Sequence, residues 1–124
     1  MRLKFILRRF HEMKNSASML LLSITLTSLF AYPASAAVAE IELVIKDHLF
    51  FPATLEIPAG QKVRIRIINQ DSTPEEFESY ELNREKIIVG NGQAVIFIGP
   101  LEPGRYPFFG EFFPKTAQGV VIVK

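Results

Sequence analysis

The C-terminal stretch of the chain, from Pro103 to Val123, reads PGRYPFFGEFFPKTAQGVVIV. A Pro-Gly turn at its start leads into a short aromatic strand, a loop follows over residues 110–118, and Gly119 opens a final β-branched strand. Proline and glycine favour turns, whereas runs of valine and isoleucine favour strands. The stretch therefore predicts a C-terminal β-hairpin whose two strands are joined by a long loop.

Short strands with turn signals between them occupy the chain before this hairpin. Apolar and polar residues alternate over residues 40–46 and again over 62–68, which is the period of a half-buried strand. The residues expected to point inward are Ile41, Leu43, Ile45, Val63, Ile65 and Ile67, with Phe77, Phe97, Tyr106 and Phe108 also in the core. No segment has a helical period, so the pattern predicts an all-β, antiparallel sandwich of about seven to eight strands.

The first 36 residues have the features of an export signal. Basic residues precede an apolar run over residues 17–31, and Ala34-Ser35-Ala36 is a typical cleavage site. The apolar run is shorter than the roughly 20 residues that a membrane span needs. We therefore expect a signal peptide over 1–36, with Met13 as an alternative start, and an exported domain over 37–124. That domain is expected in the periplasm or another extracytoplasmic compartment, without a stable membrane span. An uncleaved anchor is the alternative.

Removal of residues 1–36 changes the charge and the chemistry of the chain. It takes away five of the 14 basic residues and one of the 13 acidic residues, so the formal charge falls from +1 to −3. This excludes a basic surface for nucleic acid. The remaining chain has one histidine, no methionine and no cysteine. It therefore forms no disulfide, and apolar packing must hold it together.

The C-terminal stretch, together with Phe51-Pro52 and the turn Ile57-Pro58-Ala59-Gly60, resembles the cupredoxin family of Greek-key β-sandwiches. In that family the aromatic strand ends in a cysteine, and the following loop holds a histidine and often a methionine, all ligands of blue copper. Here Gly110 stands at the cysteine position and Phe113 at the histidine position. The resemblance also places Glu76-Phe77 where the first histidine ligand is found. It implies the fold of a cupredoxin without a blue copper centre.

Residues Thr73–Lys86, with Gly104–Gly119, resemble one branch of this family, the small exported proteins associated with iron permeases. The resemblance implies an accessory protein that binds or relays a metal ion, iron or copper, for a metal-uptake system. Its expected partners are the metal ion, an iron or metal permease, and periplasmic proteins.

Oxygen donors and one imidazole are the remaining candidates for metal ligands. In the cupredoxin fold the loops that carry His48, Glu76 and Glu111 meet at one end of the sandwich, and Glu78 lies on the same strand face as Glu76. A set of one histidine and several carboxylates suits Cu(II) or Fe. We therefore expect a metal site built from His48, Glu76, Glu78 and Glu111.

Two other interpretations of these residues stay open. The acidic residues could be a solvated face that binds no metal, and Phe112 and Phe113 could form a docking surface for a permease or a periplasmic partner. An enzyme is not expected, because His48 is the only imidazole that remains to activate a nucleophile.

Overall fold

The computed structural model describes residues 35–124, and every regular element in this part of the chain is a β-strand. In chain order the strands are β1 (Ala39–Lys46), β2 (Leu49–Phe51), β3 (Thr54–Ile57), β4 (Val63–Asn69), β5 (Glu75–Ser79), β6 (Arg84–Ile88), β7 (Gln93–Ile98), β8 (Gly104–Gly110) and β9 (Gln118–Val123). The predicted signal peptide over 1–36 and the alternative start at Met13 lie outside the described residues, apart from Ser35 and Ala36. Residues 35–124 contain no apolar helix long enough to cross a membrane.

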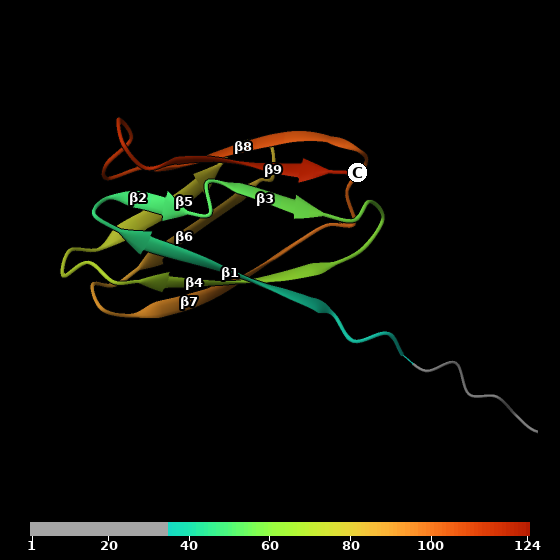
Figure 1. Cartoon of the computed structure of the whole chain (residues 1–124), viewed down its shortest axis with the longest axis horizontal. Coiled ribbons are helices and arrows are strands. Elements are labelled where there is room, and N and C mark those ends of the chain that lie inside the picture. Colours follow the sequence, from blue (N-terminus) through green and yellow to red (C-terminus); the bar gives the residue numbers. More distant parts are fainter. Residues whose placement is uncertain (1–34) are drawn as a thin grey trace, which may run out of the picture. The chain divides into compact units, whose positions relative to one another are not determined.

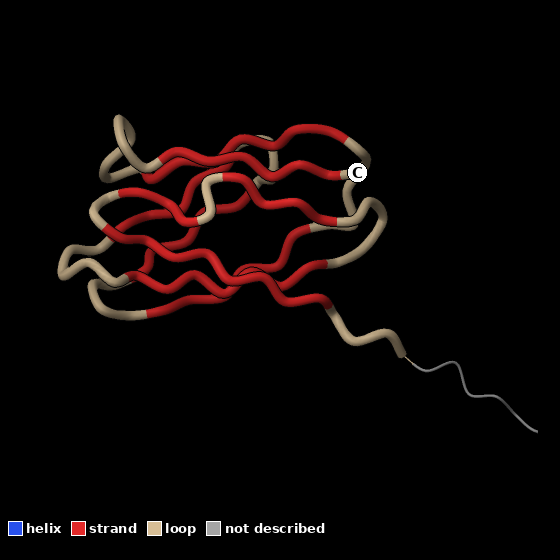
Figure 2. Tube along the Cα trace, in the orientation of Figure 1, coloured by secondary structure: helices blue, strands red, loops and turns tan. Residues whose placement is uncertain are grey.

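The strands form two sheets that face each other as a sandwich (Figure 1). The first sheet has the order β2-β1-β4-β7, and the second has the order β3-β9-β8-β5-β6. Loops connect the strands at both ends of the sandwich (Figure 2). The predicted all-β sandwich is confirmed, with nine strands in residues 35–124 where seven to eight were expected, but the expectation of an antiparallel sandwich is wrong in two pairings. Strand β1 pairs in parallel with β4, and β3 pairs in parallel with β9.

Buried and outward-facing side chains alternate along β4, as the sequence predicts. Val63, Ile65 and Ile67 of β4 are fully buried, whereas Arg64 and Arg66 lie on the outer face. The guanidinium groups of these two arginines form ion pairs with Glu40 and Glu42 on the neighbouring strand β1. The outer face of the first sheet is therefore neutralised by its own charges.

The core between the sheets is built around a cluster of aromatic rings. The rings of Phe77 and Phe108 stack with their centroids 5.0 Å apart, and Phe50 meets the ring of Phe108 edge-on at 5.1 Å. All three side chains are buried. Each buried ring contributes on the order of 2–3 kcal/mol to the free energy of folding. Because Phe77 lies in β5, this cluster fixes the strand on which two of the candidate metal ligands are found.

The expected burial of Phe97 is wrong, because the side chain is 41% exposed on the outer face of β7. The register of β7 against β4 places Phe97 opposite Arg64, while the buried Ile96 and Ile98 lie opposite Ile65 and Val63. The sequence of β7 is almost entirely apolar, so it has no alternation from which the inward face could be predicted. Tyr106 is half-buried, and its hydroxyl donates a hydrogen bond to the carbonyl of Glu102.

This orientation of β7 leads to a simple prediction. Ile98→Ala should lower the free energy of unfolding by about 2–5 kcal/mol, because it leaves a cavity in the core. Phe97→Ala should cost less than about 1 kcal/mol, because its ring lies on the surface beneath the Lys62 ammonium group. Urea denaturation of both variants measures the two values. Equal losses would mean that the orientation of β7 is wrong.

Candidate functional site

Three loops meet at one end of the sandwich, at the left in Figure 1. They are the β1–β2 turn, the β4–β5 loop and the β8–β9 loop. The imidazole of His48 stacks on the ring of Phe113, with centroids 3.6 Å apart, and its Nδ1 lies 3.5 Å from the Oδ2 of Asp71. The N–H of Glu111 donates to the carbonyl of Glu76 at 2.9 Å. The three loops are thus in contact: the β1–β2 turn meets the other two through His48, and the β8–β9 loop meets β5 through Glu111 and Glu76.

His48 is held by Asp71 and by an unusual turn. Asp47 and His48 both have positive backbone φ angles, at 54° and 57°, a region that residues other than glycine seldom occupy. The carboxylate of Asp71 accepts hydrogen bonds from both backbone N–H groups, at 2.8 and 2.9 Å. Burial by itself raises the pKa of Asp71, but these two bonds, with the charges of His48 and Lys46, lower it overall. The Asp71 carboxylate therefore stabilises the turn in its ionised form.

Asp71→Ala should lower the free energy of unfolding at neutral pH by about 1.5–3 kcal/mol, because it removes an ionised acceptor of two hydrogen bonds. The lowered pKa gives the sign of the pH dependence. An aspartate with a depressed pKa contributes stability above its ordinary value of 3.8 and loses that contribution as the pH falls through its folded-state pKa. Urea denaturation between roughly pH 6 and pH 2 should show the two proteins converging. A constant difference over that range would contradict this role.

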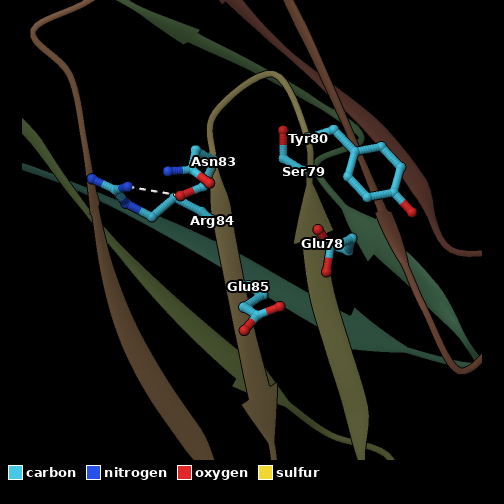
Figure 3. A pocket seen from close by; sticks show the side chains of 6 residues that line it. All are labelled: Glu78, Ser79, Tyr80, Asn83, Arg84 and Glu85. Atoms are coloured by element: carbon cyan, nitrogen blue, oxygen red, sulfur yellow. Dashed lines mark hydrogen bonds between the residues drawn. The ribbon is translucent and has the colours of Figure 1, made fainter.

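Three carboxylates come together on the outer face of the second sheet. Glu76 and Glu78 point outward from β5, and Glu85 points outward from β6. One oxygen from each of the three lies within 4.8 Å of the others, and among residues 35–124 this is the one group of three or more metal-ligand side chains that close together. Glu78 and Glu85 are directly opposite each other in the β5–β6 register. Figure 3 shows these two carboxylates side by side on adjacent strands.

The charges around Glu78 are unfavourable for the ionised protein alone. Partial burial raises the pKa of Glu78, and the negative charges of Glu85, Glu111 and Glu76 raise it further. Like charges directly opposite each other on paired strands destabilise a sheet. This outer face therefore holds negative charge that a cation would neutralise.

No ion pair in the described part of the chain involves these three carboxylates. The ion pairs found there join other acids, namely Glu40, Glu42, Glu56 and Asp71, to their partners. Arg84 lies next to Glu85 in sequence, but its guanidinium donates to the carbonyls of Phe97 and Asn83, both at 2.8 Å. Figure 3 shows the bond to Asn83. A cation at this site would have to come from outside the domain.

An open pocket of about 380 Å³ adjoins the carboxylates at the β5–β6 turn. Its lining residues, drawn in Figure 3, are Glu78, Ser79, Tyr80, Asn83, Arg84 and Glu85. Glu78 and Glu85 therefore border a space that solvent and small solutes enter.

The four residues expected as metal ligands divide into three groups. Glu76 and Glu78 lie together, Glu111 lies close enough for its charge to affect Glu78, and His48 lies outside the carboxylate group, against Asp71 and Phe113. Glu85, the third carboxylate of the group, was not among the expected ligands. A hairpin with its turn over residues 80–83 pairs residue 78 with residue 85, so the strand register was the signal that could have found it.

The resemblance placed Glu76 at the position of the first copper ligand, and the structure orients Glu76 and its neighbour Glu75 to opposite faces of β5. The side chain of Glu75 points inward from β5, on the same face as the buried Phe77, whereas Glu76 points outward. Glu75 is 1% exposed and its carboxylate lies beside Gly110, the residue at the cysteine position. Alternation along β5 was the signal for these orientations, since Glu75 and Phe77 must share a face.

Comparisons with known proteins agree with this architecture. The family described as "Cupredoxin-like domain" matches residues 18–123 of the chain. The chain belongs to the cupredoxin-like domain family. An uncharacterized protein of Rickettsia prowazekii (strain Madrid E) is 46% identical over 86 residues, which are 69% of each chain. Cupredoxin-like domains are for the most part electron carriers or binding domains.

Solved structures share the same fold at low sequence identity. Auracyanin A, a blue copper protein from Chloroflexus aurantiacus, has a TM-score of 0.62 and 15% identity, over 71% of this chain and 100% of its own. The metal-binding domain of the Cu(I)-exporting P-type ATPase CopA from Streptococcus pneumoniae D39 has a TM-score of 0.58 and 21% identity. That match covers 68% of this chain and 84% of the CopA domain. This cupredoxin-like domain is therefore similar in fold to copper-binding proteins.

The residues at the copper position of this cupredoxin-like domain do not fit a blue copper centre. Such a centre needs a cysteine thiolate and two imidazoles, and the chain contains no cysteine. Gly110 offers no side chain, Phe113 is apolar, and the buried Ala117 packs in the same place. The Glu75 carboxylate occupies the remaining space and accepts hydrogen bonds from the backbone. A metal ion bound by residues 35–124 is therefore not held as blue copper.

Proposed function

We propose that this cupredoxin-like protein is an exported accessory protein of a metal-uptake system, which binds an iron or Cu(II) ion on the outer face of β5 and β6. The observation that carries the proposal is the group of three carboxylates, Glu76, Glu78 and Glu85, whose oxygens lie within 4.8 Å of one another. The metal ion is the cargo of this protein. The resemblance to exported proteins associated with iron permeases supports the uptake context and a permease as the partner.

The chemistry of the three carboxylates favours a hard cation. Oxygen ligands suit hard ions, whereas soft ions prefer thiolate and thioether groups, which residues 37–124 lack. Iron therefore fits this set better than Cu(I). Glu111 would supply a further oxygen beside Glu78, because its charge already acts on that carboxylate. His48 is left out of the proposed site, because Asp71 and Phe113 hold its ring.

The placement of the carboxylates suits transfer of an ion more than its storage. They lie on a sheet surface, with Glu76 and Glu78 half-buried and Glu85 exposed. A site on a surface leaves part of the coordination sphere to water or to ligands of a partner. A permease or a second periplasmic protein would take the ion by adding its own ligands from the open side.

The test is a calorimetric titration of the purified protein with Mn²⁺, with Fe²⁺ under anaerobic conditions, and with Cu²⁺. We expect one ion to bind tighter than roughly millimolar, about 4 kcal/mol. Weaker binding for all three ions would leave the acidic residues as a solvated face.

If no metal ion binds, a docking function is the second candidate for this protein. The favouring observation is the exposed apolar surface at the loop end, where Phe112 is 44% exposed and Leu49 is 39% exposed. A permease or a periplasmic protein would then bind this end without any metal.

A further inference from the structure

A buried carboxylate with no role in the proposed metal site lies at the loop end of the sandwich. Glu75 is 1% exposed and belongs to the inner face of β5. Burial of a carboxyl group is costly unless hydrogen bonds compensate it. Its presence among the core residues therefore requires a structural reason.

The hydrogen bonds of Glu75 connect two segments far apart in the sequence. Its Oε1 accepts from the backbone N–H of Glu76 and from that of Phe112, each at 2.9 Å. The second bond joins the start of β5 to the β8–β9 loop across 37 positions of the chain. The neighbouring bond from the N–H of Glu111 to the carbonyl of Glu76 reinforces this connection.

The other oxygen, Oε2, has no hydrogen-bond partner in the described part of the chain and packs against Gly110. A Cβ at position 110 would lie 2.5 Å from both Cδ and Oε2 of Glu75, and 2.7 Å from the Cβ of Ala117. Such distances are too short for any real side chain. Residue 110 must therefore be glycine as long as the Glu75 carboxylate occupies this position.

We propose that Glu75 replaces the metal as the group that holds the β8–β9 loop, and that it closes this end of the domain to metal ions. The resemblance to copper-binding cupredoxins places their ligands at residues 110 and 113, within this same loop. Here the carboxylate fills the space between β5 and the loop, and its hydrogen bond to Phe112 fixes the loop backbone. This inference does not rest on the carboxylate site on the outer face.

A double-mutant cycle tests the dependence of Gly110 on Glu75. Gly110→Ala should lower the melting temperature of the wild-type protein by about 10 °C or more, because the new methyl group clashes with the carboxylate. The same change in a Glu75→Ala background should cost clearly less, because the carboxylate atoms are gone and only the close contact with the Cβ of Ala117 remains. Equal losses in the two backgrounds would overturn the proposal.

Hydrogen exchange tests the role of Oε1 with a milder variant, which is informative even if Glu75→Ala does not fold. In Glu75→Gln the amide oxygen still accepts both backbone bonds, so the exchange rate of the Phe112 amide should change by less than about threefold. In Glu75→Ala that rate should rise by more than about tenfold. Fast exchange in the glutamine variant would overturn the assignment of Glu75 as an acceptor that holds the loop.

A Cu²⁺ and Mn²⁺ titration of Glu75→Gln separates this inference from the proposed function. We expect both affinities to equal those of the wild-type protein, whatever those affinities are. A loss of binding at an unchanged melting temperature would make Glu75 a metal ligand, and this would overturn the proposal that it closes the loop end. If the outer-face site is wrong instead, Glu78→Gln and Glu85→Gln would leave the affinities for Cu²⁺ and Mn²⁺ unchanged.

Discussion

Replacement of Phe77 by alanine should lower the free energy of unfolding by about 3–5 kcal/mol, enough to unfold a large fraction of a domain of this size. The side chain is fully buried, stacks on Phe108 and lies edge-on to Phe50, so its loss opens a cavity in the middle of the core. Phe77 also lies between Glu76 and Glu78 on β5. The variant should therefore lose both its cooperative melting transition and its ability to bind metal.

The matched control is Phe97→Ala, which removes the same side chain from the outer face of β7. Circular dichroism during thermal melting compares the two variants directly. If Phe77→Ala melted within a few degrees of the control, the aromatic cluster would not be the centre of the core, and the inward face of β5 would need to be reassigned.

Replacement of Glu78 by glutamine should weaken metal binding by about 10- to 100-fold and at the same time make the metal-free protein more stable. The loss of affinity follows from the removal of a charged ligand from a group of three. The gain in stability follows from the raised pKa of Glu78. When the pKa of an acid is raised in the folded state, its protonated form is the one that favours folding. The free energy of unfolding therefore decreases as the pH rises through the folded-state pKa and the acid ionises. The neutral amide avoids this loss.

The increase in melting temperature of Glu78→Gln should be about 1–5 °C at neutral pH, the range expected for like charges on paired strands. It should disappear at acidic pH, where Glu78 is protonated in both states. Metal affinity of the wild-type protein should fall with decreasing pH, and should begin to fall at a higher pH than for carboxylates with ordinary pKa values.

Glu81→Gln is the control for these measurements. Glu81 lies exposed in the turn between β5 and β6 and outside the carboxylate group, so its replacement changes the net charge equally. If both variants lost the same affinity, general electrostatic attraction would explain the binding, and no specific site would be needed.

The fold was predictable from the sequence because its signals are local. Alternation along β1 and β4 identified the inward residues correctly, and the hairpin at residues 103–123 was read from its turn residues and its β-branched strand. The parallel pairing of β1 with β4 was not predictable in this way. The direction of this pairing depends on which strand becomes the neighbour of β1 in the sheet, and the residues of a strand do not indicate its neighbour.

The site was predicted in part, because its residues meet through pairing between strands. Glu76 and Glu78 share a face by simple alternation, so they were found together. Glu85 joins them only through the β5–β6 register, whereas the burial of Glu75 follows from the same alternation, because Glu75 shares the inner face of β5 with Phe77. His48 was expected beside Glu76 because the three loops do meet, but Asp71 and Phe113 hold its ring there instead.

We propose that this cupredoxin-like domain binds its metal on the outer face of β5 and β6, away from the copper position of the fold. Paramagnetic broadening of backbone amide signals by Mn²⁺ or Cu²⁺ locates the bound ion directly. The amides of Glu76, Glu78 and Glu85 should broaden first, at substoichiometric metal. Broadening centred instead on Gly110, Phe113 and His48, or no selective broadening at all, would contradict this proposal.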